Sequence, residues 1–319
     1  MATFCVTGGA GFIGSNLVEG LVARGDRVRV VDNLSTGHIE NLEPMSAKIE
    51  FINADISDTA LMREVFSGVD VVFHEAAIPS VQKSILDPQR SNQANITGTL
   101  SVLVAARDAK VRRVIYAGSS SVYGDTPTLP KAESMPPHPI SPYGIMKWVG
   151  ELYAHQFTKL YGLETITLRY FNVFGPRQDP TSEYSGVLSK FITSMLRSEQ
   201  PVIYGDGEQS RDFTFVQNVV QANFLAANTS KGIGEVLNVA VGCRYSLNET
   251  LKILNRIFSS RVTARYEAPR AGDIKHSQAD ITRARACLEY EPKFDFETGL
   301  RHTVDWYRAK VPSLPLKPQ

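Results

Sequence analysis

Three polar side chains in the middle of the chain could act together as a base and its supports. Tyr143 and Lys147 stand four residues apart, so a helix would place a phenol and an ammonium on one face. A free tyrosine has a pKa of about 10, and lowering it by about three units for work near neutral pH requires about 4 kcal/mol. A nearby ammonium favours the phenolate. Ser119, which follows a short apolar run, could bond to the same substrate oxygen.

A glycine-rich turn near the N-terminus suits a dinucleotide. Gly8, Gly11 and Gly14 lie between an apolar run and a helix-like stretch, where missing side chains allow close approach to a pyrophosphate. Asp32 ends the next apolar run, 18 residues after Gly14, and a carboxylate there accepts bonds from a ribose diol and repels a 2′-phosphate. Because Asn33 rather than an arginine follows, these residues favour NAD over NADP. The positive nicotinamide ring would also help to stabilise the phenolate.

The segments that carry these residues alternate between two kinds. Short apolar runs, typical of strands covered on both faces, occupy residues 4–7, 28–32, 49–53, 69–74, 114–117 and 165–171. Helical stretches fall between them, at residues 12–23, 59–66 and 92–109 and from Pro142 to a stop at Gly162. This alternation predicts an α/β protein with a Rossmann-type, doubly wound parallel sheet.

The pattern changes after residue 176, where the segments become shorter and turns more frequent. We expect helices at residues 216–228, 246–258, 282–288 and 298–308, a strand at 235–241, and a frayed, proline-rich tail at 311–319. Residues 1–176 are predicted to form the NAD-binding domain, with 213–242 returning to it. Residues 177–212 and 243–319 are predicted to form a smaller α/β domain that binds the substrate.

The composition is that of an ordinary globular protein and excludes several classes. The 319 residues are 43% hydrophobic and 21% charged, and a net charge of +1 does not indicate a nucleic-acid surface. We expect no membrane span, and no secretion because no basic leader is evident. Three scattered cysteines fit a reducing cytoplasm, and the histidines lack metal-ligand spacing, so no metal is expected. His74 is predicted to pack at the end of a strand.

Taken jointly, longer stretches resemble the extended short-chain dehydrogenase/reductase family, in its NAD-dependent epimerase/dehydratase branch. The matching stretches are TGGAGFIG (7–14), VVDNLSTG (30–37), HEAAIPSV (74–81), GSSSVYGD (118–125), SPYGIMK (141–147), LRYFNVFGPRQDP (168–180), QSRDFTFV (209–216) and PRAGDIKHSQAD (269–280). The resemblance covers nearly the whole chain and is closest to UDP-N-acetylglucosamine and UDP-glucose 4-epimerases. It implies tightly held NAD and a nucleoside diphosphate sugar in a C-terminal cleft.

The resemblance also implies which residues make the contacts. Ser119, Tyr143 and Lys147 would be catalytic. The cofactor contacts would come from Gly8, Gly11, Phe12, Ile13, Gly14, Asp32, Asn33, Ser35, Thr36, Gly37, Asp55, Ile56, Ala76, Ala77, Ile78, Asn95, Tyr143, Lys147 and Tyr170. The UDP-sugar contacts would come from Ser80, Ser119, Ser120, Ser121, Tyr143, Asn172, Val187, Tyr204, Arg211, Arg270, Asp273 and Ser277.

The residues after Ser119 discriminate among the reactions of the branch. The sugar-nucleotide 4,6-dehydratases of the branch that this chain resembles carry an acidic pair at the positions of Ser120 and Ser121. Many decarboxylating relatives keep a glutamate at the position of Ser121. Both are serine here, so no spare acid or base is evident. This favours oxidation and re-reduction at one carbon, which is 4-epimerisation: Tyr143 takes the 4-hydroxyl proton, hydride passes to NAD, and the 4-keto sugar turns before hydride returns.

The choice of sugar rests mainly on Ser277, at a position where related epimerases place a gatekeeper near the C2 substituent. A small residue admits an N-acetyl group, so we expect the enzyme to accept UDP-GlcNAc and UDP-GalNAc, together with UDP-Glc and UDP-Gal. Pro79, where some acetyl-preferring relatives have glycine, is a departure. The alternatives are a UDP-glucuronate 4-epimerase or decarboxylase, a 4-ketosugar reductase, and a non-catalytic NAD-binding scaffold.

The family is usually homodimeric, and two helical segments could form the interface. Residues 92–109 and the helix from Pro142 could pair with their symmetry mates as a four-helix bundle. Gly98, Ala105 and Ala154 would allow close approach, although the same residues could instead pack within one chain.

Overall fold

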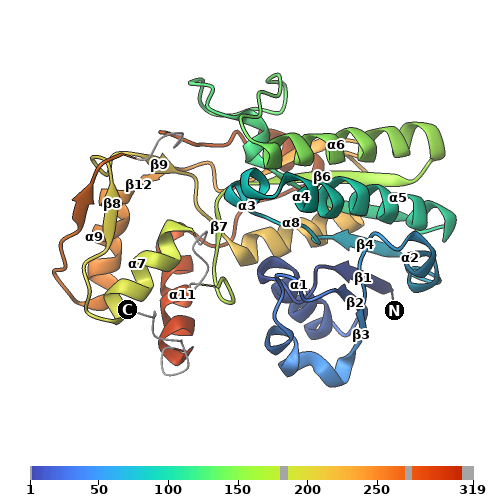
Figure 1. Cartoon of the computed structure of the whole chain (residues 1–319), viewed down its shortest axis with the longest axis horizontal. Helices are drawn as coiled ribbons and strands as arrows, with labels where there is room; N and C mark the ends of the chain where they lie inside the picture. Colours follow the sequence, from blue (N-terminus) through green and yellow to red (C-terminus); the bar gives the residue numbers. More distant parts are fainter. Residues whose placement is uncertain (1, 180–185, 270–274, 311–319) are drawn as a thin grey trace.

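A seven-stranded parallel sheet dominates the N-terminal part of the computed structural model, which describes residues 2–179, 186–269 and 275–310. The strand order is β11-β6-β5-β4-β1-β2-β3 (Figure 1). The strands are β1 (Thr3–Thr7), β2 (Arg27–Asp32), β3 (Ile49–Asn53), β4 (Val71–His74), β5 (Arg113–Ser119), β6 (Glu164–Tyr170) and β11 (Val236–Val239). The predicted Rossmann-type doubly wound sheet is therefore confirmed.

Helices cover both faces of the sheet because successive side chains of each strand point to opposite faces. One face packs on α1 (Phe12–Ala23), α8 (Val216–Asn228) and α10 (Thr282–Leu288). The other packs on α2 (Thr59–Val65), α5 (Gly98–Asp108) and α6 (Pro142–Tyr161). The strand β11 reaches the sheet from the C-terminal side of the sequence and pairs with β6. The division of the chain into two domains stays a prediction.

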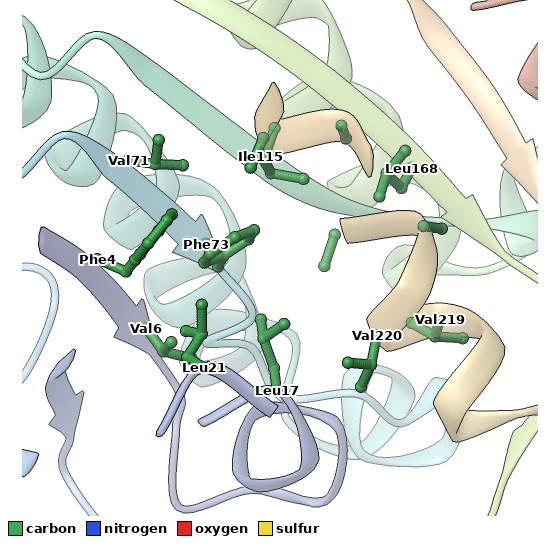
Figure 2. Close-up of a cluster of buried hydrophobic side chains, with 14 of the residues drawn as sticks. Phe4, Val6, Leu17, Leu21, Val71, Phe73, Ile115, Leu168, Val219 and Val220 are labelled. Atoms are coloured by element: carbon green, nitrogen blue, oxygen red, sulfur yellow. The ribbon is translucent and has the colours of Figure 1, made fainter. Parts of the chain in front are cut away.

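The core on the α1 side is a continuous apolar cluster. Figure 2 shows Phe4 of β1 and Phe73 of β4 beside Leu17 of α1, with Val219 of α8 completing the cluster. The rings of Phe4 and Phe73 stack with their centroids 5.7 Å apart. Full burial of one such side chain contributes about 1.5–3 kcal/mol, so this face fixes the strand ends rigidly.

The C-terminal part of the chain has its own apolar cluster and much shorter strands. Helices α7 (Val187–Leu196), α9 (Leu247–Phe258) and α11 (Phe296–Lys310) pack around this cluster, at the end of the molecule far from β2 and β3 (Figure 1). The strands form three pairs: β7 (Val173–Phe174) with β10 (Thr214–Phe215), β8 (Val202–Tyr204) with β13 (Arg265–Glu267), and β9 (Ser210–Arg211) with β12 (Tyr245–Ser246).

Local sequence signals explain several boundaries of the helices. Ser141 caps α6 by accepting a bond from the Gly144 N–H, and Gly162 ends the helix in the left-handed region, both as expected. Ser246 and Glu249 form a capping box at the start of α9.

Other segments differ from the sequence-based expectation. The expected helix at residues 92–109 is divided into α4 (Pro88–Asn92), a π-helical stretch at Gln93–Thr97, and α5. Helix α7, the short α3 (Val81–Leu86), and the 3-10 turns at Ile39–Asn41, Glu43–Lys48 and Ser120–Tyr123 were not expected. Among the described residues, no helix combines the length and apolar character needed to cross a membrane.

The sheet order places the site. Chain connections leave β1 in opposite directions, toward β2 and β3 on one side and toward β4, β5 and β6 on the other. Ligands of such sheets bind outside the carboxyl ends of the strands at this switch point. Asp32, His74, Ser119 and Tyr170 are each the last residue of a strand at this edge.

Candidate active site

The turn between β1 and α1 leaves no room for side chains at two glycines. Gly8 has φ +70°, and a Cβ there would lie 2.6 Å from the backbone nitrogen of Ala76. A Cβ on Gly14 would lie 2.2 Å from the Gly8 carbonyl oxygen. Gly11 is the N-cap residue that precedes α1 and provides no side-chain cap, so the first N–H groups of this helix suit an anionic ligand. The turn therefore has the shape and charge that a dinucleotide diphosphate needs.

Asp32 is held in place at the end of β2. Its Oδ2 accepts a bond from the Ala10 N–H at 2.9 Å, and its Oδ1 accepts one from the Leu34 N–H at 2.8 Å. Burial raises the pKa of this carboxyl, and the two backbone donors oppose that rise. Asn33 donates to Asp55 at 2.8 Å, which fixes the adjoining strand ends. A fixed carboxylate here fits a ribose diol.

One cavity of about 1220 Å³ connects these elements to the middle of the chain. Typical small-molecule sites measure roughly 300–1,000 Å³, so this one has room for two ligands. Most of the predicted site residues line it: Gly8, Gly11, Phe12, Ile13, Gly14, Asp32, Asn33, Ser35, Thr36, Asp55, Ile56, Ala76, Ala77, Ile78, Ser80, Ser119, Ser120, Ser121, Tyr143, Tyr170, Asn172, Arg211 and Ser277.

Five predicted residues do not line the cavity, and two lie outside the described residues. Gly37 packs against Asp32 behind the wall, and Asn95 bonds to both backbone groups of Ile78. Val187 begins α7 and packs against the C-terminal cluster, and Tyr204 ends β8. Lys147 stands behind the wall, as described below. Arg270 and Asp273 fall in the range that the structure does not describe.

The predicted catalytic residues meet at the ends of β5 and α6. Lys147 is 4% exposed and donates a hydrogen bond from Nζ to the Ala117 carbonyl at 2.8 Å. Its ammonium lies 6.0 Å from the ring centroid of Tyr143. The Ser119 hydroxyl accepts bonds from the N–H and the hydroxyl of Ser121, at 3.2 and 2.9 Å. A hydrogen bond from the Ser119 side chain also favours the ionised form of Tyr143.

The protein's own groups raise the pKa of Tyr143 and lower the pKa of Lys147. Burial raises the pKa of Tyr143 to about 12, opposed by the Ser119 hydrogen bond. Burial lowers the pKa of Lys147 to about 8, opposed by carboxylates. The expected lowering depends on the ammonium together with the positive nicotinamide ring, and the protein's side chains do not supply it alone. Loss of water around the phenol outweighs their effect, and the lowering must come in part from the positive nicotinamide ring.

The side of the cavity that is predicted to bind the substrate is built around a buried carboxylate. Asp212 accepts backbone bonds from Val241 at 3.1 Å, Gly242 at 3.0 Å and Ala279 at 3.1 Å. Its neighbour Arg211 donates to the carbonyls of Ser210 and Lys275, at 3.0 and 3.1 Å. Ser277 bonds through its N–H to the Ser210 carbonyl, at 3.0 Å. Arg211 and Ser277 are thus brought together from segments 66 residues apart.

Several residues of the cavity wall were missed by sequence reasoning, among them the ionisable side chains of Glu75, Lys131 and Arg177. Glu75 follows β4, Lys131 is 2% exposed, and Arg177 forms an ion pair with Glu19 of α1 at 2.9 Å. The Arg177 Nη1 is buried and has no hydrogen-bond partner among the described residues. A buried, unpaired guanidinium nitrogen in this wall fits an anionic ligand, as the glycine turn does. Glu75 carried a usable signal, since a carboxyl directly follows a fully buried strand.

His74 is a structural residue, as expected. Its ring nitrogens bond to the hydroxyls of Thr7 and Thr99, at 2.8 and 2.9 Å, and the ring is 1% exposed. Among the described residues, no three His, Cys, Asp or Glu side chains are grouped as a metal ion would require.

Comparison with known proteins gives consistent relatives along the whole chain. A UDP-glucose 4-epimerase from Mycolicibacterium smegmatis is 40% identical over 311 residues, covering 96% of this chain and 98% of the relative. The solved UDP-N-acetylglucosamine 4-epimerase from Methanobrevibacter ruminantium M1, in complex with UDP-N-acetylmuramic acid, superposes with a TM-score of 0.93 at 42% identity. It covers 97% of this chain and 99% of that chain.

A third relative carries the cofactor. The UDP-glucuronic acid 4-epimerase from Bacillus cereus, solved with UDP-glucuronic acid and NAD, has a TM-score of 0.88 at 32% identity and covers 96% of this chain and 99% of that chain. Residues 4–240 match the family model described as "NAD dependent epimerase/dehydratase family". With the glycine turn, the fixed Asp32 and the cavity that they border, these matches show that the chain belongs to the NAD-dependent epimerase/dehydratase family.

Proposed function

We propose that the protein is an NAD-dependent UDP-hexose 4-epimerase that interconverts UDP-GlcNAc and UDP-GalNAc, and also UDP-Glc and UDP-Gal. One observation carries the choice of reaction. Tyr143 and Lys147 lie beside a turn whose side chains at Ser119, Ser120 and Ser121 are all hydroxyls, and these serines line the cavity. Elimination of water would need a further acid and base at this turn, whereas inversion at one carbon needs only the phenol.

The proposed mechanism assigns a proton task to each residue. Tyr143 takes the proton of the sugar 4-hydroxyl and later returns it, while Ser119 bonds to the same oxygen. Lys147, held by the Ala117 carbonyl, stabilises the phenolate through its charge. The glycine turn, Asp32 and the buried Arg177 nitrogen would hold NAD, which would supply a reversible hydride acceptor when bound. Short side chains on the 119–121 turn leave the 4-keto sugar room to turn over.

The diphosphate and the sugar are assigned to the other wall. Arg211 would bind the diphosphate, because two carbonyls already fix its guanidinium and Arg suits phosphate oxygens. Asn172, held by its amide bond to the Asp212 carbonyl at 3.2 Å, would contact the phosphate and sugar. Ser277, a small residue in this wall, would leave room for a C2 N-acetyl group. The contacts expected of Ser80, Val187, Tyr204, Arg270 and Asp273 remain proposals.

Turnover of purified protein with separate UDP-sugars tests this function. The protein is incubated without added reductant with UDP-GlcNAc, UDP-Glc or UDP-glucuronate, and the products are separated by anion-exchange chromatography. Formation of UDP-GalNAc and UDP-Gal is expected. Turnover of UDP-glucuronate alone would instead identify the enzyme as a UDP-glucuronate 4-epimerase, as the Bacillus cereus relative is.

A variant sharpens the choice of sugar. Ser277→Tyr fills the space proposed for the N-acetyl group, so it should lower the rate with UDP-GlcNAc about tenfold relative to UDP-Glc. Equal rates in the variant and the wild type would contradict the gatekeeper role of Ser277.

We also propose a homodimer built on α5 and α6. Gly98, Ala105 and Ala154 are buried within the chain itself, so the proposed interface does not rely on them. Ile145 and Leu152 of α6 are instead exposed, each at 48%, and could pack against a second copy. Sedimentation of the wild type and of Leu152→Glu, which places a charge on this surface, tests the interface.

A further inference from the structure

Glu75 is a carboxyl group in the cavity wall for which the proposed mechanism has no role. It follows β4 directly and lines the cavity. The Tyr170 hydroxyl donates to Glu75 Oε1 at 2.7 Å, and Asn223 of α8 donates to the Tyr170 oxygen at 2.9 Å. Tyr170 is 7% exposed and Asn223 is fully buried. Elements from three parts of the sequence thus hold this carboxyl in one orientation.

Of the two carboxylates that interact with Lys147, Glu151 is paired with another cation within the described ranges and Glu75 is not. Lys147 is buried, and its ammonium forms none of the ion pairs found within 4 Å among the described residues. Glu151, one turn later on α6, is held by Arg169 through two bonds of 2.9 and 2.7 Å. The Arg169 guanidinium therefore balances the charge of Glu151. Glu75 bonds to the neutral Tyr170 hydroxyl and forms no ion pair in the described part of the chain. The pairing of β4 with β5 brings Glu75 toward Lys147: His74 pairs with Tyr116, and the carbonyl of the next β5 residue, Ala117, accepts the Lys147 bond.

The charges of Glu75 and Lys147 affect each other's pKa values, and the charge of Glu75 also affects the pKa of Tyr143. Burial raises the pKa of Glu75 to about 7, and both the Tyr170 bond and the Lys147 charge oppose the rise. Burial lowers the pKa of Lys147 to about 8, and the charge of Glu75 opposes this more than that of Glu151 does. The Glu75 charge also raises the pKa of Tyr143.

The adjoining histidine does not take part in this balance. Burial lowers the pKa of His74 to about 3, so its ring is neutral near neutral pH and adds no charge beside Glu75. The ionisable groups that interact with Glu75 are then Lys147 and Tyr143 of α6 and Tyr170 of β6.

We propose that Glu75 is a positioning residue whose carboxylate, fixed by Tyr170, is the counter-charge that keeps Lys147 protonated beside Tyr143. A buried ammonium without a counter-charge gives up its proton readily, and the phenolate would then lose its support. This inference rests on the roles proposed above for Tyr143 and Lys147. It adds a role for Glu75, which follows β4 and acts on Lys147 rather than on the substrate.

A titration of Lys147 in the NAD-loaded enzyme tests the proposal without using turnover. Lysine side chains are labelled with ¹³C at Cε, the Lys147 signal is assigned by its absence in Lys147→Arg, and its shift is followed against pH by NMR. Glu75→Gln keeps the size and an acceptor for Tyr170 but removes the charge. The Lys147 midpoint should fall by about one pH unit in this variant.

A matched control removes a different partly buried carboxylate. Glu133 accepts a bond from the Asn238 N–H at 2.7 Å and does not line the cavity. Glu133→Gln should leave the Lys147 midpoint at its wild-type value. Glu75→Asp keeps the charge, so its Lys147 midpoint should lie close to the wild-type value. Glu75→Met provides a second neutral variant in case Glu75→Gln does not fold, as judged by circular dichroism and NAD content.

The pH profile of kcat gives a second readout. Activity needs charged Lys147, so it falls as pH rises through the Lys147 pKa, and a lower pKa in Glu75→Gln moves this alkaline limb to lower pH. An unchanged Lys147 midpoint in both neutral variants, or an equal shift in Glu133→Gln, would overturn the proposal. If the wild type turns over no UDP-sugar, the proposed function fails, while the titration still decides the role of Glu75.

Discussion

The two walls of the cavity are built in different ways. On the cofactor side, Asp32, Ser119 and Tyr170 are the final residues of strands in one seven-stranded sheet, covered by helices on both faces. On the substrate side, Arg211 belongs to a two-residue strand and Ser277 to a loop segment. The first wall is fixed by a large apolar core, and the second by a few hydrogen bonds around one carboxylate.

This difference suggests which properties can change independently. Groups that must keep their geometry through a reaction belong on rigid elements, and groups that select among substrates belong on segments that can vary. The proposed base Tyr143 and its supporting Lys147 accordingly stand on the twenty-residue helix α6, packed on β5 and β6. Changes on the two walls should therefore affect different kinetic constants.

The largest expected effect is the loss of the phenol on the rigid wall. Tyr143→Phe removes the proposed base and should lower kcat by about 10²–10⁴-fold, since that is what a positioned acid or base contributes. Bound NAD, measured after denaturation of the purified protein, should stay at the wild-type level. Tyr153→Phe alters a tyrosine of the same helix that packs on the core, and its kcat should change little. Wild-type kcat in Tyr143→Phe would contradict the assignment.

A smaller effect is expected on the substrate wall. Arg211→Ala removes a cation assigned to the diphosphate, and a charged hydrogen bond contributes about 1.5–3 kcal/mol, so KM should rise by about 10- to 100-fold. The NAD content should not change. Arg265→Ala also removes a positive charge from the C-terminal part, from an exposed ion pair with Glu267, and should leave KM unchanged. Loss of NAD in Arg211→Ala would indicate that Arg211 binds the cofactor and not the diphosphate of the UDP-sugar.

The sequence predicts the rigid wall better because its signals are local. Gly8, Gly11 and Gly14 and the carboxylate at the end of the next strand, Asp32, lie within 25 residues, so their pattern needs no knowledge of distant contacts. Glu75 and Tyr170 are 95 residues apart in the sequence. They meet because β4 and β6 lie on either side of β5 and end at the same edge of the sheet. No local pattern could show that this carboxyl has a tyrosine as its partner.

The other wall gave weaker signals for the same physical reason. Its strands are two or three residues long, too short to show a period of two, and α7 was not recognised. The direction in which the protein alone shifts the pKa of Tyr143 could not be predicted from the sequence, because it depends on how much water burial removes. Spacing along a helix brings an ammonium near a phenol but does not report burial.

An effect on local stability, and not on the chemical step, should come from breaking the hydrogen bonds that hold the substrate wall together. Asp212→Asn leaves one acceptor oxygen where two accept three backbone bonds, and places an NH₂ group against a donor. Local opening should become easier by about 1–3 kcal/mol. Hydrogen exchange at the amides of Val241, Gly242 and Ala279 should therefore accelerate by roughly 5- to 150-fold, while amides of β1 keep their wild-type rates.

A neighbouring carboxylate gives the matched control for this prediction. Asp206 accepts a bond from the Glu208 N–H at 3.0 Å in an exposed turn of the same part of the chain. Asp206→Asn should leave exchange at Val241, Gly242 and Ala279 unchanged. Faster exchange in β1 of Asp212→Asn would mean that the two walls open together. The chain would then be one cooperative unit, and the separation of kcat from KM effects would lose its structural basis.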